Sequence, residues 1–596
     1  MTPATRWTYR PSRFLEKCAA SALGLGLSVA AGLAVAQDPQ PEDTYAIANT
    51  TEAVVAKDFM VAAANPHAVQ VGYDVLKQGG SAIDAAVAVQ MMLNLVEPQS
   101  SGLGGGAFLV YWDNESGTLQ SIDGREKAPA AATPDYFLME DGTPKGFWES
   151  VIGGRSVGVP GTLRLLELAH TLYGTMPWDT LLAPTIELAE KGFEVSPRLA
   201  DSIEGSNTDD RQLAKFDSTR AYFFNEDGSP KAAGTVVKNP ELANTLQLIA
   251  EKGPDVFYRG EIAKDIVAAV AATPENPGIM TLEDLAGYQA KIRAPVCVAY
   301  RSYDVCGMGP PTSGGITVGQ MLGVLSHFDL PSMGLGLDAV HVFAEAGKLA
   351  YADRGMYIAD SDFVSVPVRG LLEPGYLTGR AQLVDMDAAM ESAKAGHPPW
   401  VSAELRAPDT DPERPGTSHF VIVDAKGNAL SMTTTIETGF GSRIMVRGFL
   451  LNNELTDFSR APEKDGRLIA NRVEGGKRPR SSMAPTIVMR DSQPYLLVGS
   501  PGGSRIINYV AKTLVAVLDW GMDPQQAINL GNFANRNGAT DLEAATGMTE
   551  LQAGLEARGH EVNVRDLNSG LHAILLTDDM LVGGADPRRE GIVMGE

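Results

Sequence analysis

A long stretch without hydrophobic periodicity is followed by two strongly apolar segments. Residues 392–416 are rich in proline and charge, so we expect a long, exposed loop there. Residues 417–424 and 429–436 are mostly apolar or β-branched, and a turn sequence at 426–428 separates them. This pattern predicts a hairpin of two core strands, with Thr417 at the first position.

Helical and strand patterns alternate irregularly over the rest of the chain. Apolar residues recur at helical spacing from Pro66 to Leu76, and a second helix, capped by Ser81, is expected to run to about Leu95. The sequence SGLGGGAFLVYWD then indicates a glycine loop that leads into a strand. Further helices are predicted at about 161–173, 179–191, 240–252 and 338–352. Without a βαβ period or an internal repeat, these elements favour a layered α+β fold.

Composition and charge restrict the class of protein. The chain has 596 residues, of which 44% are hydrophobic, so it can bury a large core. Its formal charge of −24 gives no basic surface for nucleic acid, and none is expected as a partner.

The first 36 residues have the pattern of a secretory signal peptide. Four basic residues precede an uncharged run from Cys18 to Ala36, which ends in the small-x-small sequence Ala34-Val35-Ala36. A transmembrane anchor is the alternative, but the run is rich in Ala, Gly and Ser and short for a bilayer span. We expect cleavage after Ala36, no membrane span afterwards, and a periplasmic location, with secretion as second choice.

Two cysteines remain after removal of that segment. If Tyr300 and Tyr303 pair across a two-residue turn, Cys297 and Cys306 lie directly opposite each other on adjacent strands. This arrangement predicts a cross-strand disulfide, and two buried free thiols are the alternative.

Several common catalytic and cofactor motifs are missing from the sequence. It contains no GxxxxGK[ST], HExxH, CxxC pair, EF-hand loop or GxSxG, and its eight histidines are scattered. The glycines at 102–106 follow a helix and precede a strand, which is the reverse of a phosphate-binding loop. We therefore expect no metal and no organic cofactor.

The junction of Gly416 and Thr417 carries the main chemical hypothesis. A threonine that starts a buried strand after a loop could become a new N-terminus, and its α-amino group could then act as general base for its hydroxyl. Taken alone, a Gly-Thr pair before a strand is ordinary turn chemistry.

Further sequence segments, in order along the mature chain, extend the hypothesis. The sequence resembles the γ-glutamyltransferase (γ-glutamyl transpeptidase) family in the segments HAVQVGYDVLKQGGSAIDAAVAVQ, EPQSSGLGGGAF, DGREKAP, VGVPG, PPTSGG, PGTSHFVIVDAKGNALSMTTTIETGFGS, LLNNELTDFS, GKRPRSSMAPTIV and GSPGGSRII. The resemblance implies a four-layer αββα sandwich of the N-terminal-nucleophile hydrolase type. It also implies a precursor that cuts itself between Gly416 and Thr417 into a large subunit, 37–416, and a small subunit, 417–596, which stay together as a heterodimer.

The resemblance also implies a reaction and a set of roles. Thr417 would attack the γ-amide of glutathione or another γ-glutamyl donor, and the acyl group would pass to water or to an amino acid or peptide acceptor. Thr435 would orient this nucleophile, while the amides of Gly502 and Gly503 would form the oxyanion hole.

Binding of the donor's α-amino acid end falls to a second group of residues. The α-carboxylate would be held by Arg125, Ser481 and Ser482, because a guanidinium fork suits a carboxylate. The α-ammonium would be held by Asp457, with Glu454 as a second acceptor.

Two departures from the family pattern bear on specificity. Glu437 stands where many members carry an Asn that contacts the donor carboxylate, so an extra anion would weaken carboxylate binding unless it is turned away or protonated. The stretch RAPEKDGRLIANRVEGG is shorter than the usual lid and lacks an aromatic residue, which predicts a more open site.

Two alternatives remain at this point. An acylase of the same fold, acting on glutaryl-type side chains such as those of cephalosporins, would not need Asp457, because such side chains lack the α-ammonium. A non-catalytic periplasmic binding protein would not need the retained Thr417, Thr435 and glycine pair.

Overall fold

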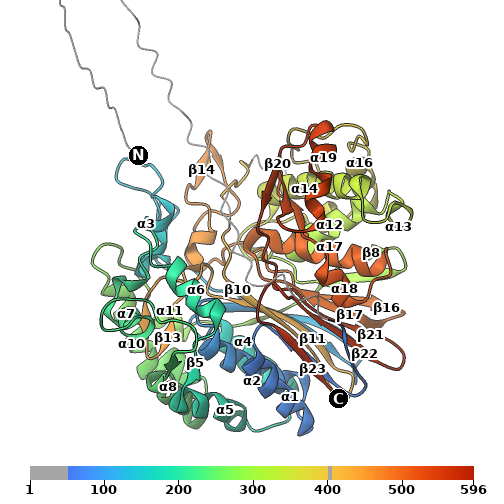
Figure 1. Cartoon of the computed structure of the whole chain (residues 1–596). Helices are drawn as coiled ribbons and strands as arrows, with labels where there is room; N and C mark the ends of the chain where they lie inside the picture. The colour runs from blue at the N-terminus through green and yellow to red at the C-terminus, as the bar shows by residue number, and fades with distance from the viewer. Residues whose placement is uncertain (1–51, 401–405, 412) are drawn as a thin grey trace, which may run out of the picture. The chain divides into compact units, whose positions relative to one another are not determined.

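Two seven-stranded antiparallel sheets lie face to face at the centre of the computed structural model, which describes residues 52–400, 406–411 and 413–596 (Figure 1). The hairpin sheet has the strand order β23 (Ile592–Gly595), β2 (Met60–Ala63), β10 (Thr417–Val423), β11 (Ala429–Thr435), β3 (Gly106–Asp113), β4 (Thr118–Gly124) and β7 (Lys291–Arg293). The opposing sheet has the order β1 (Val54–Ala56), β22 (Leu581–Ala585), β21 (His572–Leu576), β17 (Gln493–Gly499), β16 (Thr486–Arg490), β9 (Tyr303–Gly307) and β8 (Val296–Tyr300).

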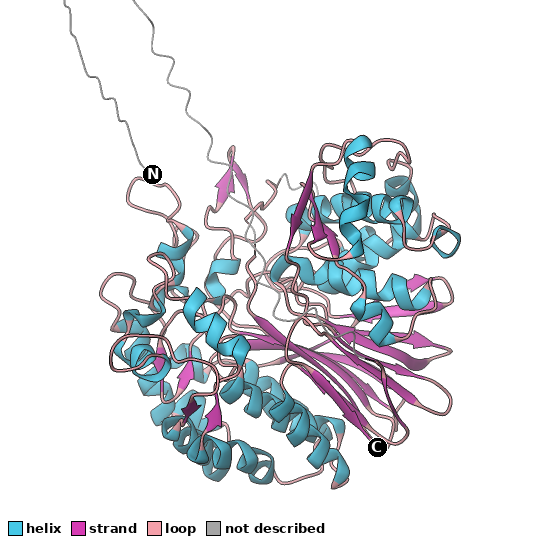
Figure 2. Cartoon of the chain, viewed as in Figure 1, coloured by secondary structure: helices cyan, strands magenta, loops and turns pink. Residues whose placement is uncertain are grey.

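Helices cover the outer face of each sheet, so the layers follow the order αββα (Figure 2). The hairpin sheet is covered by α1 (Pro66–Lys77), α2 (Ala82–Val96) and α4 (Thr162–Tyr173); α5 (Trp178–Lys191) packs on α2, and α8 (Pro240–Lys252) packs on α5. The opposing sheet is covered by α12 (Gly314–Leu325), α17 (Ile506–Leu518) and α18 (Pro524–Asn529), and α14 (Leu337–Tyr357) packs on α12. The predicted α+β sandwich is confirmed, as are the helices predicted from the apolar spacing.

Shorter elements complete the described part of the chain. The remaining helices are α3 (Phe147–Val151), α6 (Pro197–Gly205), α7 (Asp217–Phe223), α9 (Asp255–Arg259), α10 (Glu261–Ala271), α11 (Leu282–Ala286), α13 (Leu330–Met333), α15 (Val368–Leu371), α16 (Pro374–Ala381) and α19 (Gln552–Ala557). The remaining strands are β5 (Phe193–Glu194), β6 (Val236–Val237), β12 (Met445–Val446), β13 (Phe449–Leu450), β14 (Glu463–Lys464), β15 (Arg467–Leu468), β18 (Phe533–Asn535), β19 (Thr540–Glu543) and β20 (Val562–Arg565).

The alternation of side chains along β10 explains why every residue of this strand is buried. Phe420 and Ile422 belong to the core beneath the outer helices, whereas Val421 and Val423 belong to the core between the two sheets. Because side chains alternate between the faces of a strand, Thr417 points toward the opposing sheet. A shift of one residue in register would exchange these two sets, so the register is strongly fixed.

Segments before and after Gly416 are interleaved in both sheets. In the hairpin sheet β10 pairs with β2 on one side and with β11 on the other, and β11 pairs with β3. In the opposing sheet β16 pairs with β9. Strand ladders therefore join the two segments, and a cut at this junction would leave them associated.

The segment before the hairpin differs from its prediction. Residues 392–416 were expected to be exposed, but Asp409 and Glu413 are both 7% exposed. The Asp409 amide donates to the carbonyl oxygen of Gly355 at 2.9 Å, and its carboxylate accepts from Asn471 at 2.9 Å. Buried polar partners thus draw the end of this segment inward, a feature that composition cannot predict.

The predicted disulfide is present. Cys297 lies opposite Cys306 in the β8–β9 pair, Tyr300 lies opposite Tyr303, and the two sulfur atoms are bonded. Among the described residues no helix is both long and apolar enough to cross a bilayer. The expected signal peptide, residues 1–36, lies outside the described residues.

The disulfide gives a direct prediction for the protein without residues 1–36. Titration of the denatured, unreduced protein with a thiol reagent should find no free thiol, because both remaining cysteines form one bond. After reduction the same titration should find two. Two free thiols before reduction, in protein purified from an oxidising compartment, would contradict the pairing.

Candidate active site

Thr417 begins the central strand of the hairpin sheet and lies directly opposite Thr435 on β11. Thr417 is buried, with 4% of its surface exposed. The backbone oxygen of Thr417 accepts a hydrogen bond from Arg589 Nη1 at 3.0 Å. The first residue of the strand is therefore fixed by strand pairing on one side and by an arginine on the other.

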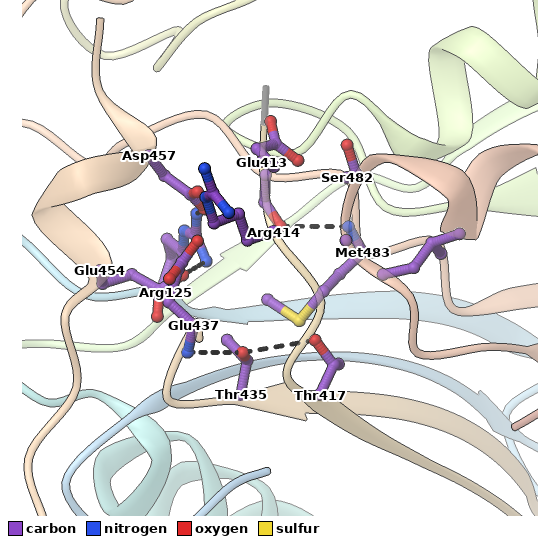
Figure 3. A pocket seen from close by; sticks show the side chains of 13 residues that line it. Arg125, Glu413, Arg414, Thr417, Thr435, Glu437, Glu454, Asp457, Ser482 and Met483 are labelled. Atoms are coloured by element: carbon purple, nitrogen blue, oxygen red, sulfur yellow. Dashed lines mark hydrogen bonds and ion pairs between the residues drawn. The ribbon is translucent and has the colours of Figure 1, made fainter. Parts of the chain in front are cut away.

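The hydroxyl of Thr435 connects the two sides of the Gly416–Thr417 junction, and Figure 3 shows its contacts with Thr417 and Glu437. Thr435 Oγ1 donates to the carbonyl oxygen of Gly416 at 2.7 Å. Thr435 Oγ1 also accepts a hydrogen bond from the amide of Glu437 at 2.8 Å and one from Thr417 Oγ1 at 3.4 Å. A threonine hydroxyl has one proton and two acceptor positions, so all three hydrogen-bonding positions of the Thr435 hydroxyl are occupied.

Arg125 lies beside this pair, at the end of β4, and faces two buried carboxylates. Its guanidinium pairs with Glu454 and, at 2.5 Å, with Asp457 Oδ2; both acidic residues lie on the 3₁₀ turn Glu454–Asp457. Burial alone would lower the pKa of Arg125, but the nearby carboxylates more than offset this and raise it. Burial raises the pKa of Glu454 and Asp457 well above the ordinary range.

The same cluster has acceptor capacity that the described residues do not use. Glu454 Oε2 and Asp457 Oδ1 are buried and have no hydrogen-bond partner within the described ranges. Glu437, in a left-handed conformation with φ of 77°, accepts from Asn453 Nδ2 at 2.5 Å. Burial, followed by repulsion from Asp457, raises the pKa of Glu437 well above its ordinary value. The cluster thus has more carboxyl groups than cations and could accept a further positive group.

Ser481 and Ser482 line the same cavity from a different direction. The backbone oxygen of Ser481 accepts from Ser313 Oγ at 2.7 Å, which ties this loop to the start of α12. Ser482 Oγ accepts from Arg354 Nη2 at 2.8 Å, and Arg354 lies in the last turn of α14. The hydroxyl proton of Ser482 can donate to an anion, and in this structure Glu413 accepts it.

Gly502 and Gly503 form the turn between β17 and α17. Their φ angles of 132° and 58° lie in the region that side chains avoid. A Cβ at Gly503 would lie 2.7 Å from the carbonyl carbon and oxygen of Arg414. Backbone from another segment therefore approaches this turn closely, as a reacting carbonyl would have to do.

Glu413 and Arg414, the residues just before the Pro415-Gly416 pair, lie inside the cavity (Figure 3). The Arg414 guanidinium stacks over the Phe147 ring at 4.1 Å and lies close enough to Glu437 to lower its pKa. Sequence reasoning did not place Glu413 or Arg414 in the site, and their charge beside the candidate junction was the only signal for them. Arg354, which contacts Glu413 and Ser482, is distant in sequence and carried no signal.

Most of the residues singled out from the sequence line one cavity, and Gly502 lies beside it, next to Gly503. The cavity is lined by Arg125, Glu413, Arg414, Thr417, Thr435, Glu437, Glu454, Asp457, Ser481, Ser482, Met483, Gly503 and Ile506. The stretch expected to be a short lid contains the exposed pair β14–β15, and the amide of Ala407 donates to the carbonyl oxygen of Leu468 at 3.1 Å. Whether this stretch leaves the site open to bulky groups stays a prediction.

Two histidines lie between the sheets beneath the junction, and the sequence analysis did not single them out. His419 Nδ1 is 2.9 Å from Thr433 Oγ1, and the rings of His419 and His572 are 6.3 Å apart. Burial lowers the pKa of His572 to about 4 and that of His419 well below its ordinary value. Both rings are therefore neutral near pH 7.

This depressed pKa predicts a dependence of stability on pH. An unfolded histidine has a pKa near 6.5. Below pH 6.5 the unfolded chain therefore binds a proton at this position that His572 does not bind in the folded protein. The stability that neutral His572 contributes is present above pH 6.5 and is lost as pH falls toward 4, by up to about 3 kcal/mol. Thermal unfolding is measured by calorimetry at pH 7.5, 5.5 and 4.5. As the pH is lowered over this range, the unfolding temperature of His572→Gln should fall less than that of the unmodified protein.

The control for this experiment is His67→Gln, because His67 is exposed on α1. Its pH profile should match that of the unmodified protein. An unchanged profile in His572→Gln as well would show that His572 does not contribute to acid lability.

Comparisons with known proteins agree with this geometry. A family model described as Gamma-glutamyltranspeptidase matches residues 68–596. The chain is similar to a glutathione hydrolase proenzyme of Bacillus subtilis (strain 168), with 40% identity over 554 residues, 91% of this chain and 92% of that protein. It is also similar to a glutathione hydrolase proenzyme of Escherichia coli (strain K12), with 38% identity over 587 residues, 96% and 98% of the two chains. The crystal structure of a cephalosporin acylase from Bacillus halodurans matches with a TM-score of 0.80 at 28% identity, over 92% of this chain and 97% of that one.

Proposed function

Because this chain belongs to the gamma-glutamyltranspeptidase family, we propose that it cuts itself before Thr417 and then hydrolyses or transfers γ-glutamyl groups through that residue. The expected family and enzyme class, γ-glutamyltransferase and glutathione hydrolase, are confirmed. Both relatives are named proenzymes, which fits self-processing. The observation that carries the proposal is the hydrogen bond from Thr435 Oγ1 to the carbonyl oxygen of Gly416.

Self-cleavage begins with attack of Thr417 Oγ1 on the carbonyl carbon of Gly416. The peptide nitrogen leaves as the α-amine of Thr417, and an ester joins Gly416 to Oγ1. Water then hydrolyses the ester, which frees the hydroxyl and leaves a carboxylate on Gly416. The hydrogen bond from Thr435 supports this step because it withdraws electron density from the carbonyl that is attacked. The β-methyl of threonine restricts χ1 and so favours one orientation of the attacking oxygen.

The freed α-amine then serves the second reaction as general base. It takes the proton of Thr417 Oγ1 while that oxygen attacks the γ-carbonyl of the donor, and it returns the proton to the departing amine. The backbone amides of Gly502 and Gly503 stabilise the oxyanion that forms, because a carbonyl oxygen can approach this turn closely. The resulting γ-glutamyl ester is attacked by water or by an amino acid or peptide acceptor.

The charges in the cavity suit the zwitterionic end of a γ-glutamyl donor. An α-ammonium has three N–H donors, and Glu454 Oε2 and Asp457 Oδ1 are buried acceptors without a hydrogen-bond partner in the described part of the chain. Its charge would also relieve the repulsion among Glu437, Glu454 and Asp457. We assign the α-carboxylate to Arg125, Ser481 and Ser482. Glutathione is the donor that the relatives' names suggest.

An acylase for glutaryl-type amides is the second candidate, because the cephalosporin acylase structure shares the fold. A glutaryl group carries the terminal carboxylate but no ammonium. It would leave the orphaned oxygens of Glu454 and Asp457 unpaired, at a cost of about 1–3 kcal/mol each. This observation favours the γ-glutamyl donor. The remaining alternative, a non-catalytic binding protein, does not fit the enzyme family.

The proposed enzyme needs no metal or organic cofactor for these steps, since the nucleophile, base and oxyanion donors are all part of the chain. Its two fragments, 37–416 and 417–596, are proposed to remain one heterodimer because strands of one fragment pair directly with strands of the other in both sheets. We propose a periplasmic location, with secretion as second choice, on the sequence of residues 1–36.

Substitution of Thr435 by valine tests the cleavage step. Valine keeps the branched shape but loses the hydrogen bond to Gly416, so we expect self-cleavage to slow by about 10²-fold. The fraction of cut chain is followed by denaturing intact mass after synthesis. Thr417→Ala is the control that should stay uncut; cleavage of that variant at the same bond would refute the nucleophile assignment.

Substitution of Arg125 by lysine tests donor binding. Lysine keeps a positive charge beside Glu454 and Asp457 but cannot form a two-pronged contact with a carboxylate. The KM for γ-glutamyl-p-nitroanilide should rise about 10-fold to 100-fold, with a smaller change in kcat. An unchanged kcat/KM would remove Arg125 from the donor site.

A further inference from the structure

Glu413 is a carboxylate of the chain itself that occupies a buried cationic site next to Thr417. It is 7% exposed and forms an ion pair with Arg354 Nη2, and Arg480 Nε lies 3.6 Å from its carboxylate. Arg354 also donates to Ser482 Oγ at 2.8 Å. Burial would raise the pKa of Glu413, but Arg354, Arg480 and a hydrogen bond from Ser482 together hold it below its ordinary value. The site thus binds an ionised carboxylate in the uncut chain.

The buried charges at this site balance only while Glu413 is present. Asp409 Oδ2 lies 3.0 Å from Arg480 Nη2, so two carboxylates face the two guanidinium groups. Asp409 is also held by the side chain of Asn471 and by the backbone of Gly355. If Glu413 leaves and Asp409 stays, one positive charge remains uncompensated in a buried place, which is unfavourable.

After cleavage, the residues that follow Glu413 must move away before a donor can react. A Cβ at Gly503 would lie 2.7 Å from the carbonyl of Arg414, so the backbone before the cut lies against the turn that a reacting carbonyl must reach. A donor can therefore react only after the new C-terminal residues 414–416 withdraw. Glu413 is three residues from that end, and we infer that it withdraws with residues 414–416.

We propose that Arg354 and Arg480, together with Ser482, take the α-carboxylate of the donor in the cut protein, in the place that Glu413 holds before the cut. This proposal rests on the proposed function. It enlarges the carboxylate site from Arg125 and the serine pair to a site with three arginines. Glu413 already lies close enough to Arg125 for that arginine to lower its pKa, so one carboxylate can interact with all three.

Unused hydrogen-bond donors support this assignment. Arg480 is 1% exposed, and its Nε and Nη1 have no hydrogen-bond partner among the residues that the structure describes. Ser482 Oγ accepts from Arg354 and donates to Glu413 in the uncut chain, so its proton becomes available to a substrate carboxylate if Glu413 leaves. A buried guanidinium with unused donors is costly, and a substrate carboxylate would satisfy it.

The ligand class follows from this chemistry. The site recognises an amide whose acyl group carries a carboxylate at the far end of a three-carbon chain, as γ-glutamyl and glutaryl groups do. A 4-aminobutyryl amide has the same chain with an ammonium in place of the carboxylate, so it can use Asp457 but not the arginines. These three acyl groups separate the carboxylate site from the ammonium site.

The experiment compares p-nitroanilides of these three acyl groups on Arg480→Leu, with protein shown by intact mass to be cut at Thr417. We expect kcat/KM for the γ-glutamyl and glutaryl anilides to fall about tenfold, mainly through KM, and kcat/KM for the 4-aminobutyryl anilide to change less than twofold. Arg480→Lys and Arg354→Lys, which keep the charge, should lose less. Arg490→Leu, on the far end of β16, is the matched control and should match the unmodified enzyme.

Two results would overturn the proposal: an equal loss on all three substrates, which indicates a structural role, or no loss on any of them. Glutarate binding, measured by calorimetry on the same cut proteins, tests the site without turnover, and Arg480→Leu should weaken it about tenfold. If the unmodified cut protein does not hydrolyse the γ-glutamyl anilide, the proposed function fails, while glutarate binding still decides this proposal. Equal glutarate affinity in both proteins would contradict it.

Discussion

The proposed chemistry depends on the pairing of Thr417 with Thr435 on two fully buried strands, β10 and β11. Strand register fixes both residues on the face toward the opposing sheet, where β10 and β11 cannot shift without exchanging their two cores. The hydroxyl of Thr435 then reaches the carbonyl of Gly416 at 2.7 Å. A flexible loop could not hold a hydroxyl and a carbonyl in this relation, because precise placement needs a rigid support.

Buried charged side chains surround the cavity next to this pair of threonines. Glu437, Glu454 and Asp457 line the cavity, where Arg125 pairs with Glu454 and Asp457. Arg354 and Arg480 contact Glu413, another residue of the lining. In the proposed cut protein, withdrawal of residues 413–416 would take Glu413 away from these two arginines and Arg414 away from Glu437. The proposed donor, with an ammonium and a carboxylate on one carbon, would then replace the charges of Glu413 and Arg414.

Much of the fold followed from the sequence because local patterns agreed with the tertiary structure. The hairpin at 417–436, the helices α1, α2, α4, α5, α8 and α14, and the Cys297–Cys306 pair all rest on spacing that the structure reproduces. The segment before Thr417 was predicted wrongly as exposed, because its burial depends on Arg480, Asn471 and Gly355, which are distant in sequence. Arg354 and the histidine pair were missed for the same reason. Short motifs gave the site residues, but only the fold shows which charges face them.

The most direct test of this account is the intact mass of the purified, unmodified protein under denaturing conditions, with N-terminal sequencing of each species. The account predicts two chains that separate only on denaturation, the smaller one beginning with the sequence Thr-Ser-His-Phe. A single chain that persists after long incubation, or an internal cut within residues 37–596 at a bond other than Gly416–Thr417, would contradict the claim that Thr417 is both the site of cleavage and the nucleophile.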